Sequence, residues 1–456
     1  MLSISIYTLG CKLNQLESEA IAGAFRDAGF LVLPLNEDEP TDVVVVNTCT
    51  VTSKAEQKAR RIIRKLAANN ACVIVSGCYA QMDAQAIAAI DRRVVVLAGD
   101  RKSALLDLPA ALAPVREAGV ACEYHVSSLP DSISRLLHSP FSGVARVEQF
   151  RYAPDRFSFH SRAFLKIQDG CDRRCAYCRV RLARGPSVSL EPERALSQLR
   201  VFEEKGYCEA SLTGVNINQY ASGVDLAGLV SYLLKGTRRI RIRLSSIEPE
   251  GVTETFCAAI ADTRVCPHFH LSVQAGCDAV LAKMARPYTR EVVERSAALL
   301  RSVKDDPFLG CDIIAGFPSE TAADFEETLD LCERVGFAWI HAFPYSPRPG
   351  TAALRFKEKT PDREISRRVD ALLALAREGR RSYINRQIGK RAVAVIEAAD
   401  DAPSGFVAGT TETYLKVLLH APEGEAPRAG DAVSCALTDA EYASSPLAYD
   451  MRGTIL

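Results

Sequence analysis

The sequence predicts an α/β protein in three parts: an N-terminal parallel-sheet α/β domain, an incomplete βα barrel of six repeats, and a small C-terminal antiparallel β-barrel. The first observation is length, because 456 residues suffice for about three ordinary domains. The second is that apolar runs alternate with amphipathic stretches in two separate regions, which is the rhythm of βα units. The third is a change to short β-rich segments in the last part of the chain.

The first part, residues 1–120, contains five strand-like runs: SISIYTL, FLVLPL, DVVVVNT, CVIVSG and VVVLAG. Runs that are apolar throughout are typical of parallel strands buried on both faces. Helical periodicity over 15–28 and 54–68 predicts connecting helices. At the start of the second helix, Ser53 and Glu56 are three residues apart, which predicts a capping box.

The second and third parts follow a segment, 121–156, whose Pro, Ser and Gly residues predict a linker containing a hairpin or a short helix. Over 157–386 six strand-like runs alternate with helical patterns: AFLKIQ, EASLTG, IRIRLSS, FHLSV, LGCDIIAG and WIHAFPY. Six repeats predict an incomplete parallel barrel, with functional residues where strands end. A basic helix over 366–386 closes it, and 387–456 predicts the small antiparallel barrel.

The composition excludes several classes of protein. The 56 basic and 56 acidic residues cancel, so overall charge gives no argument for a nucleic acid, a membrane surface or an acidic substrate. The N-terminus lacks a secretory signal and no apolar run approaches the length of about 18 residues that a membrane span needs, so we expect a cytoplasmic protein. In that reducing compartment the 15 cysteines are expected to bind metals rather than form disulfides.

The string DGCDRRCAYC contains three cysteines in a CxxxCxxC pattern just after the first predicted barrel strand: Cys171, Cys175 and Cys178, here called the loop trio. Three thiolates in one loop can hold three irons of a [4Fe-4S] cluster and leave the fourth iron open for chemistry. The alternative is a structural zinc site. Such sites usually have four protein ligands, and the next cysteine, Cys208, is thirty residues away.

Three more cysteines each lie just beyond the carboxyl end of an apolar run in the first part: Cys11, Cys49 and Cys78, here called the sheet trio. Because the carboxyl ends of parallel strands share one edge of a sheet, we expect these thiols to converge. The alternative is that they are buried small apolar side chains. Cys72, which opens a strand, fits that interpretation, as do the others: Cys122, Cys208, Cys257, Cys266, Cys277, Cys311, Cys332 and Cys435.

The CxxxCxxC pattern, with the aromatic Tyr177 before its last cysteine, resembles the signature of radical S-adenosylmethionine enzymes. Two cysteine trios followed by a small β domain resemble the methylthiotransferases of that class over nearly the whole chain. The strings LSSIEPE, HLSVQAGCD, DIIAGFPSET and FPYSPRPGT are similar to that family too. The resemblance implies a radical S-adenosylmethionine barrel, a C-terminal TRAM domain and two [4Fe-4S] clusters.

The resemblance also implies roles for individual residues. The loop trio is expected to hold the catalytic cluster, which binds S-adenosylmethionine and cleaves it to a 5′-deoxyadenosyl radical, and the sheet trio an auxiliary cluster that handles sulfur. The implied contacts to S-adenosylmethionine are Tyr177, Gly214 and Asn216. The last two lie in the segment 211–216, for which an ordinary strand-to-helix turn is the alternative.

The string TLGCKLNQLESE around Cys11 resembles the type that acts on N6-threonylcarbamoyladenosine beside the tRNA anticodon. The implied reaction replaces the C2 hydrogen by a methylthio group. The implied partners are the tRNA anticodon stem-loop, an electron donor such as flavodoxin or ferredoxin, and a sulfur source. The chain departs from that type in the string RVRLARG after Cys178, and in Ala285 and Pro287 around Arg286.

Two alternatives to this function remain open at the level of sequence. A methylthiotransferase could instead act on isopentenyladenosine in tRNA or on a ribosomal-protein aspartate. A protein of another class, a non-catalytic iron–sulfur redox sensor that binds RNA, would also have cysteines and basic patches.

Basic residues recur at helical spacing after Cys49 and predict a stripe that binds RNA phosphates: Lys54, Lys58, Arg61 and Lys65. The alternative is a solvated helix face. The range 156–194 adds nine basic and four acidic residues around the loop trio. The C-terminal part has five basic and ten acidic residues, which leaves Lys390, Arg391 and Lys416 as its candidate RNA contacts. Phe343 and Tyr345 could stack an extruded base or belong to the core.

Overall fold

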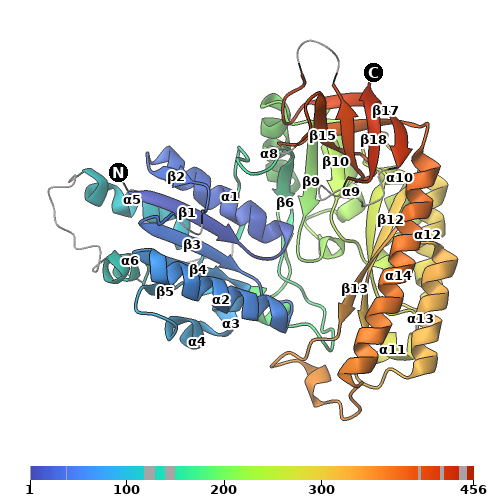
Figure 1. Cartoon of the computed structure of the whole chain (residues 1–456), viewed down its shortest axis with the longest axis horizontal. Coiled ribbons are helices and arrows are strands. Elements are labelled where there is room, and N and C mark those ends of the chain that lie inside the picture. The colour runs from blue at the N-terminus through green and yellow to red at the C-terminus, as the bar shows by residue number, and fades with distance from the viewer. Residues whose placement is uncertain are drawn as a thin grey trace.

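The computed structural model describes residues 2–36, 39–117, 129–138, 149–398, 402–421, 426–440 and 449–456. Three regions of regular structure follow one another along the chain, and the C-terminal barrel lies at one end of the second region (Figure 1). None of the helices in these ranges is long and apolar enough to cross a membrane. Cys122 lies outside the described residues.

The N-terminal part is a parallel sheet covered by helices on both faces (Figure 1). Its strands are β1 (Ser3–Thr8), β2 (Leu31–Leu33), β3 (Val43–Thr48), β4 (Cys72–Gly77) and β5 (Val94–Val96), and its helices are α1 (Lys12–Asp27), α2 (Ser53–Asn69), α3 (Cys78–Met82), α4 (Ala84–Ala88), η1 (Gly99–Arg101), α5 (Ala104–Glu117) and α6 (Leu129–His138). The strand order is β2-β1-β3-β4-β5. The central strands β3 and β4 are buried along their whole length, which explains their unbroken apolar sequences.

The two faces of this sheet have separate hydrophobic cores. Helices α1, α5 and α6 pack on one face and α2, α3 and α4 on the other. The predicted linker contains α6, whose Ile133 and Leu137 are buried in the first of these cores. That core continues into the barrel, where it includes Leu165 and Leu212. The sheet and the barrel are therefore packed against each other through one continuous core.

The start of α2 differs from the prediction. The N-cap is Thr52, whose side chain accepts a hydrogen bond from the Ala55 amide at 3.1 Å. Ser53 is the first helical residue, and its hydroxyl contacts the hydroxyl of Ser346 at 3.1 Å. The Glu56 carboxylate accepts a hydrogen bond from Thr50 Oγ1 at 2.5 Å. The predicted capping box is therefore wrong, because Glu56 is used for buried contacts rather than for the helix end.

The second part has six parallel strands that form an incomplete barrel, as predicted. They are β6 (Ala163–Lys166), β9 (Glu209–Thr213), β10 (Arg241–Leu244), β11 (His268–Gln274), β12 (Phe308–Ala315) and β13 (Trp339–Pro344). A short antiparallel pair, β7 (Gln168–Asp169) with β8 (Val188–Ser189), follows the first strand. The strands form two sheets, β6-β9-β10 and β11-β12-β13, which an isolated bridge between Ile247 and Leu271 joins.

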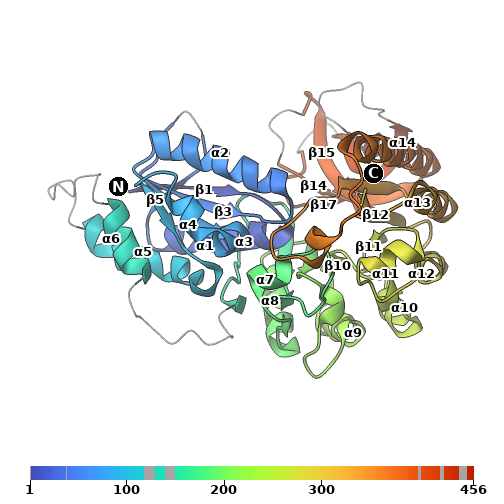
Figure 2. The same cartoon turned by 90° about the horizontal axis from the view of Figure 1, so that it is seen from below.

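Helices cover the outside of this barrel (Figure 2). They are α8 (Pro192–Glu204), α9 (Leu226–Gly236), α10 (Glu254–Ile260), α11 (Asp278–Lys283), α12 (Arg290–Val303), α13 (Ala322–Val335) and α14 (Asp362–Gln387). The short helix α7 (Val180–Arg184) packs instead against α3 of the N-terminal part. Short turns occur at η5 (Ile217–Gln219), η6 (Pro249–Gly251) and η7 (Ala352–Arg355). Helix α14 includes the predicted basic helix and leads directly into the third part.

The third part is a closed five-stranded barrel with strand order β14-β15-β16-β18-β17. Its strands are β14 (Arg391–Ile396), β15 (Phe406–Thr411), β16 (Lys416–His420), β17 (Ala432–Ala440) and β18 (Met451–Ile455). All neighbours are antiparallel except β16 and β18, which pair in parallel. The predicted small β-barrel is confirmed, with this one parallel pair as an addition.

Candidate active site

The loop trio lies between β7 and α7, just past the carboxyl end of the first barrel strand. The chain turns into the loop at Gly170, whose φ of +69° favours glycine and where a Cβ would collide with the carbonyl of Pro186. The pKa of Cys178 is raised to about 12, mainly by burial and to a smaller extent by the nearby thiols of Cys175 and Cys171. The three thiols are thus close enough to affect one another's ionisation. A bound metal would deprotonate them, because a coordinating thiol loses its proton.

Each thiol of the loop trio accepts a hydrogen bond. Arg286 Nη1 donates to Cys175 Sγ at 3.2 Å, and the amide of Val180 donates to Cys178 Sγ at 3.4 Å. Burial raises the pKa of Cys171, and hydrogen bonds from the backbone of Arg173 and the side chain of Asn216 oppose the increase. These donors can stabilise negative charge on cluster-ligating sulfurs.

The predicted cofactor contacts Gly214 and Asn216 are held beside the loop trio by Gln168. Gln168 Nε2 donates to the carbonyl of Gly170 at 2.8 Å, and its Oε1 accepts from the amide of Asn216 at 2.9 Å. A Cβ on Gly214 would lie 2.8 Å from the same Oε1, so a side chain there would displace Gln168. The segment after β9 and the cysteine loop therefore form one unit.

The third predicted contact, Tyr177, packs edge-on against Phe317, with the ring centroids 6.5 Å apart. Burial raises the pKa of its hydroxyl well above the ordinary value. The Phe317 ring also contacts that of Tyr345 at 5.5 Å. Tyr177 thus connects the cysteine loop to the aromatic residues around the end of β13.

The sheet trio converges at one edge of the N-terminal sheet. Cys11 is the N-cap of α1, Cys49 follows β3, and Cys78 is the first residue of α3 after β4, so all three stand at the carboxyl ends of adjacent strands. Burial raises the pKa of Cys49 to about 11, and the thiols of Cys11 and Cys78 add to this effect. Gly10 has a φ of +114°, and a Cβ there would lie 2.8 Å from the Cβ of Cys49 and 3.2 Å from its Sγ.

Cys72 lies at the opposite end of β4 and is completely buried, so its interpretation as a core residue fits the structure. The six thiols of the two trios are all free. Strand β4 thus begins with a core cysteine, Cys72, and is followed by a member of the sheet trio, Cys78.

The donor chemistry of the two trios fits iron–sulfur clusters. A [4Fe-4S] cluster binds each cysteine through a different iron, so the three free thiols of a trio can hold three of its irons. A structural zinc site usually has four protein ligands, and each trio offers three thiols.

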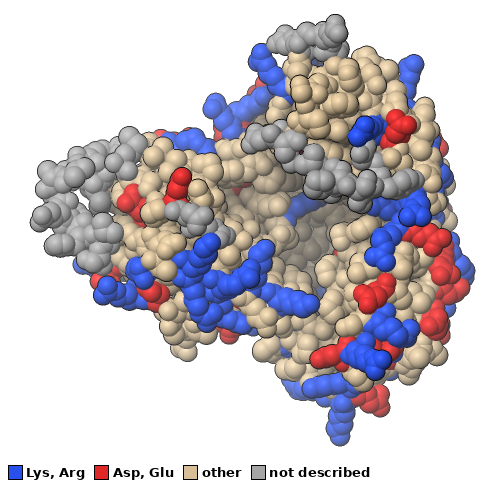
Figure 3. Space-filling view, viewed as in Figure 1, with Lys and Arg blue, Asp and Glu red and all other residues tan. Residues whose placement is uncertain are grey.

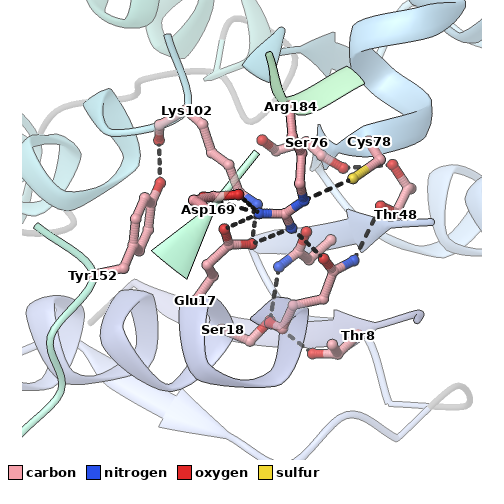
Figure 4. Close-up of polar contacts among 12 residues, drawn as sticks. Thr8, Glu17, Ser18, Thr48, Ser76, Cys78, Lys102, Tyr152, Asp169 and Arg184 are labelled. Carbon is pink, nitrogen blue, oxygen red and sulfur yellow. Dashed lines mark hydrogen bonds and ion pairs between the residues drawn. The ribbon is translucent and has the colours of Figure 1, made fainter. Parts of the chain in front are cut away.

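Buried ionic groups that the sequence analysis did not identify surround the sheet trio on the side of the barrel. Arg184, the last residue of α7, donates to Cys78 Sγ at 3.2 Å and pairs with Glu17 of α1 at 3.2 Å (Figure 4). Arg348, from the segment after β13, pairs with Glu56 of α2, as does Arg179 at 3.3 Å. Both acids therefore connect the N-terminal helices to the barrel.

The sequence does contain a signal for the buried acids Glu17 and Glu56, because each lies on the apolar face of its helix. Glu17 lies on α1 among the buried Leu13, Leu16 and Ala20, and Glu56 lies on α2 three residues before the buried Ala59. A carboxylate on the apolar face of a helix must be paired, because an unpaired buried charge is very costly. The pattern indicates a buried partner without identifying it.

The predicted phosphate-binding residues Lys54, Lys58, Arg61 and Lys65 all lie on the exposed face of α2. Figure 3 shows basic side chains gathered over this helix, beside the hollow between the two lobes of the molecule. Arg60 is turned away from this face and donates to the Tyr79 hydroxyl at 2.6 Å. The stripe of exposed cations on α2 thus fits the predicted surface.

The basic range 156–194 provides much less positive field than its composition suggests, because most of its cations are paired inside the protein. Arg173 pairs with Glu248 at 2.9 Å and Lys166 with Asp169 at 2.5 Å. Arg162, Arg179 and Arg184 are also paired, whereas the pair of Arg194 with Glu191 lies at the surface.

Of the C-terminal candidates for RNA contact, Arg391 and Lys416 are exposed, whereas Lys390 pairs with Asp306 at 3.2 Å. Phe343 is 40% exposed and stacks on His341, with ring centroids 6.2 Å apart. The hydroxyl of Tyr345 is buried and has no hydrogen-bond partner among the described residues. Phe343 therefore presents a free ring face more readily than Tyr345 does.

Two family descriptions match the chain. The Uncharacterized protein family UPF0004 matches residues 3–99, which include the sheet trio, and the Radical SAM superfamily matches residues 165–332, which include the loop trio. The family boundaries thus separate the two groups of cysteines.

Several curated proteins are similar to the whole chain. The Threonylcarbamoyladenosine tRNA methylthiotransferase MtaB of Treponema pallidum is 41% identical over 95% of this chain and 98% of that protein. The protein of the same name from Thermotoga maritima is 35% identical over 91% of each chain. A tRNA-2-methylthio-N(6)-dimethylallyladenosine synthase of Solibacter usitatus is 33% identical over 89% of this chain and 88% of that protein.

Among solved structures, the radical S-adenosylmethionine methyltransferase TsrM from Kitasatospora setae, with cobalamin and a [4Fe-4S] cluster bound, superimposes with a TM-score of 0.52. It is 16% identical and covers 77% of this chain and 74% of that one. At this identity the likeness establishes a shared fold.

Proposed function

The chain belongs to the radical S-adenosylmethionine methylthiotransferase family, in which relatives 41% and 35% identical to it are MtaB enzymes, and we propose that it replaces the C2 hydrogen of N6-threonylcarbamoyladenosine in tRNA with a methylthio group. An aromatic C–H has no acidic proton, so acid–base catalysis alone cannot remove that hydrogen. A radical abstracts it instead. The observation that carries this proposal is the convergence of two separate trios of free thiols, one in a loop and one at a sheet edge.

In the proposed enzyme the loop trio, Cys171, Cys175 and Cys178, holds one [4Fe-4S] cluster and the sheet trio, Cys11, Cys49 and Cys78, holds the other. When bound, the first cluster would supply the electron for cleavage of S-adenosylmethionine, and the second would handle the transferred sulfur. Three cysteines for each cluster would leave one iron in each without a cysteine ligand.

The protein's own residues orient these groups. Arg286 donates to Cys175 and pairs with Glu248 at 2.8 Å, so the loop trio is tied to the segment after β10. Gly214 and Asn216 are held against the same loop by Gln168, which supports their role as contacts for S-adenosylmethionine. Tyr177 packs on Phe317 beside them.

The same site contains a second acid, Glu250. Burial and the neighbouring Glu248 raise the pKa of Glu250, while Arg173, which pairs with both acids, opposes the increase. Arg173 belongs to the cysteine loop, so it connects both acids to the loop trio.

The tRNA is proposed to bind across the exposed face of α2. Lys54, Lys58, Arg61 and Lys65 face the solvent beside the hollow between the lobes, and their spacing suits backbone phosphates (Figure 3). Arg391 and Lys416 of the C-terminal barrel would add isolated contacts, and Lys390 is engaged by Asp306. Phe343 is the proposed ring for stacking the extruded base.

An external electron donor, such as flavodoxin or ferredoxin, and a sulfur source complete the proposed reaction. Reductive cleavage of S-adenosylmethionine consumes an electron at every turnover, so a donor outside the chain must supply it. Because its substrate is tRNA, the enzyme is proposed to work in the cytoplasm.

The test uses the full chain, reconstituted anaerobically with iron and sulfide and supplied with dithionite and S-adenosylmethionine. Three anticodon stem-loops are compared, carrying N6-threonylcarbamoyladenosine, isopentenyladenosine or unmodified adenosine at the same position. Mass spectrometry should detect a methylthio product from the first RNA alone, together with 5′-deoxyadenosine. A methylthio product from the isopentenyladenosine RNA instead would show that isopentenyladenosine, and not N6-threonylcarbamoyladenosine, is the substrate. Full iron loading without 5′-deoxyadenosine would favour the redox sensor.

A further inference from the structure

Arg184 connects the two cysteine trios. It is the last residue of α7, the short helix that begins two residues after Cys178, yet its side chain extends to the sheet trio (Figure 4). The side chain is 8% exposed. Helix α7 packs against α3, the helix that begins with Cys78. A residue positioned by the barrel thus reaches a cysteine positioned by the N-terminal sheet.

All three nitrogens of the Arg184 guanidinium group donate hydrogen bonds. Its Nε donates to Cys78 Sγ at 3.2 Å, and Nη2 donates to Asn14 Oδ1 at 2.9 Å. Its Nη1 donates to Asp169 Oδ1 at 3.1 Å and to Glu17 Oε1 at 3.2 Å. Because a guanidinium group is planar and rigid, these contacts fix the position of Cys78 relative to α7.

Arg184 belongs to a buried ionic network. It shares Glu17 with Lys102 (Figure 4) and shares Asp169 with Lys166. The three cations outweigh burial and hold the pKa of Glu17 at about 2. These pairs hold the guanidinium group where its Nε can donate to Cys78 Sγ.

A charged donor at a ligating sulfur changes the properties of a cluster. Hydrogen bonds to the sulfurs and nearby charge help to set the reduction potential, and positive charge favours the reduced, more negative form. The loop trio receives such a donor from within the barrel, Arg286. The sheet trio receives its donor from the other part of the molecule.

We propose that Arg184 is a positioning residue that fixes Cys78 against the radical-cluster loop and raises the reduction potential of the cluster held by the sheet trio. This inference rests on the proposed function for the presence of that cluster. It goes further by assigning to Arg184 the task of coupling the two sites.

The test isolates one cluster in the full chain. With Cys171, Cys175 and Cys178 replaced by Ala, only the sheet trio can hold a cluster, and its midpoint potential and electron paramagnetic resonance spectrum are measured during redox titration. In this background Arg184→Met should retain about four irons but have a lower potential and altered g values. Arg184→Lys keeps the charge but loses the planar fork, so its shift should be smaller in the same direction.

Arg181→Met is the matched control, because Arg181 lies on the same short helix and is exposed. It should leave the potential and the spectrum unchanged. An iron-loaded Arg184→Met protein with the parent potential and spectrum would overturn the inference alone. If the Arg184→Met protein does not hold iron, the Arg184→Lys protein is used instead. A midpoint potential equal to that of the parent in Arg184→Lys would then overturn the inference.

The two hypotheses fail in different ways. If the potential shifts as expected in the loop-trio variant, but the unsubstituted chain with both clusters forms no methylthio product, the proposed function is overturned and the role of Arg184 stands. A parent protein that binds no iron at the sheet trio would overturn both.

Discussion

The loop trio and the sheet trio each contain three thiols but are assembled in opposite ways. Cys171, Cys175 and Cys178 are brought together by local chain geometry within one loop. Cys11 and Cys78 are far apart in the sequence and meet because β1, β3 and β4 are neighbours in a parallel sheet. The first site therefore depends on a motif and the second on the folding of a whole domain.

The surroundings of the two trios differ in the same way. The donors to the loop trio come from the barrel itself, from Arg286, Asn216 and the backbone of Val180. The sheet trio receives its charged donor, Arg184, from the barrel rather than from the sheet. The comparison teaches that the sheet site is completed only when the two parts are packed together.

The largest expected effect separates the two trios by function. Replacing Cys171, Cys175 and Cys178 by Ala should abolish 5′-deoxyadenosine formation, whereas replacing Cys11, Cys49 and Cys78 should preserve it and abolish the methylthio product. Each triple variant should fall from about eight irons to about four if each trio holds one [4Fe-4S] unit. Iron analysis and product mass spectrometry check this, and loss of both activities in the sheet-trio variant would contradict the division of roles.

The next effect tests the packing that completes the sheet site. Glu56→Gln leaves Arg348 and Arg179 without their shared carboxylate, and breaking a buried ion pair in this way costs about 3–5 kcal/mol. The first transition in urea unfolding should shift accordingly. Glu204→Gln, an exposed change at the end of α8, should alter stability by no more than about 0.5 kcal/mol. Equal effects of the two substitutions would show that the buried contacts contribute little.

A smaller effect should distort one trio and spare the other. Gly10→Ala forces a side chain into a backbone conformation with φ +114° and against Cys49, at a cost of about 1–3 kcal/mol. Iron at the sheet trio should decrease while 5′-deoxyadenosine formation persists. In Gly23→Ala the new methyl group meets no atom, and a helical glycine-to-alanine change stabilises by up to about 1 kcal/mol. Full iron in Gly10→Ala would show that the strand end tolerates the change.

The smallest effect concerns the RNA surface beside the sheet trio. The double substitution Lys58→Ala and Arg61→Ala should weaken stem-loop binding. It should also reduce the magnitude of the slope of log affinity against log salt by about 1 for each lost phosphate contact. Filter binding at several salt concentrations measures both quantities. Lys235→Ala, on the exposed side of α9, is the control and should change neither. An unchanged slope in the double variant would show that Lys58 and Arg61 of α2 do not contact RNA phosphates.

The sequence predicted the fold class and both trios because they depend on regular chain geometry. Unbroken apolar runs such as DVVVVNT indicate strands buried on both faces, and the carboxyl ends of parallel strands must share one edge. The placement of Cys49 and Cys78 follows from these two rules, as does the interpretation of Cys72 as a core residue. The six-stranded barrel follows from the same alternation of elements.

The partners of buried charges could not be predicted in this way. Glu56 fits a capping-box pattern in the sequence, yet it contacts Arg348 from the other end of the barrel, and most cations of the range 156–194 are paired inside the protein rather than facing RNA. Periodicity and spacing are properties of a short stretch of chain, so the sequence by itself determined where strands end and where thiols gather. Only the tertiary structure decided which carboxylate meets which arginine, because a buried charge takes its partner from whatever element packs against it, however distant along the chain.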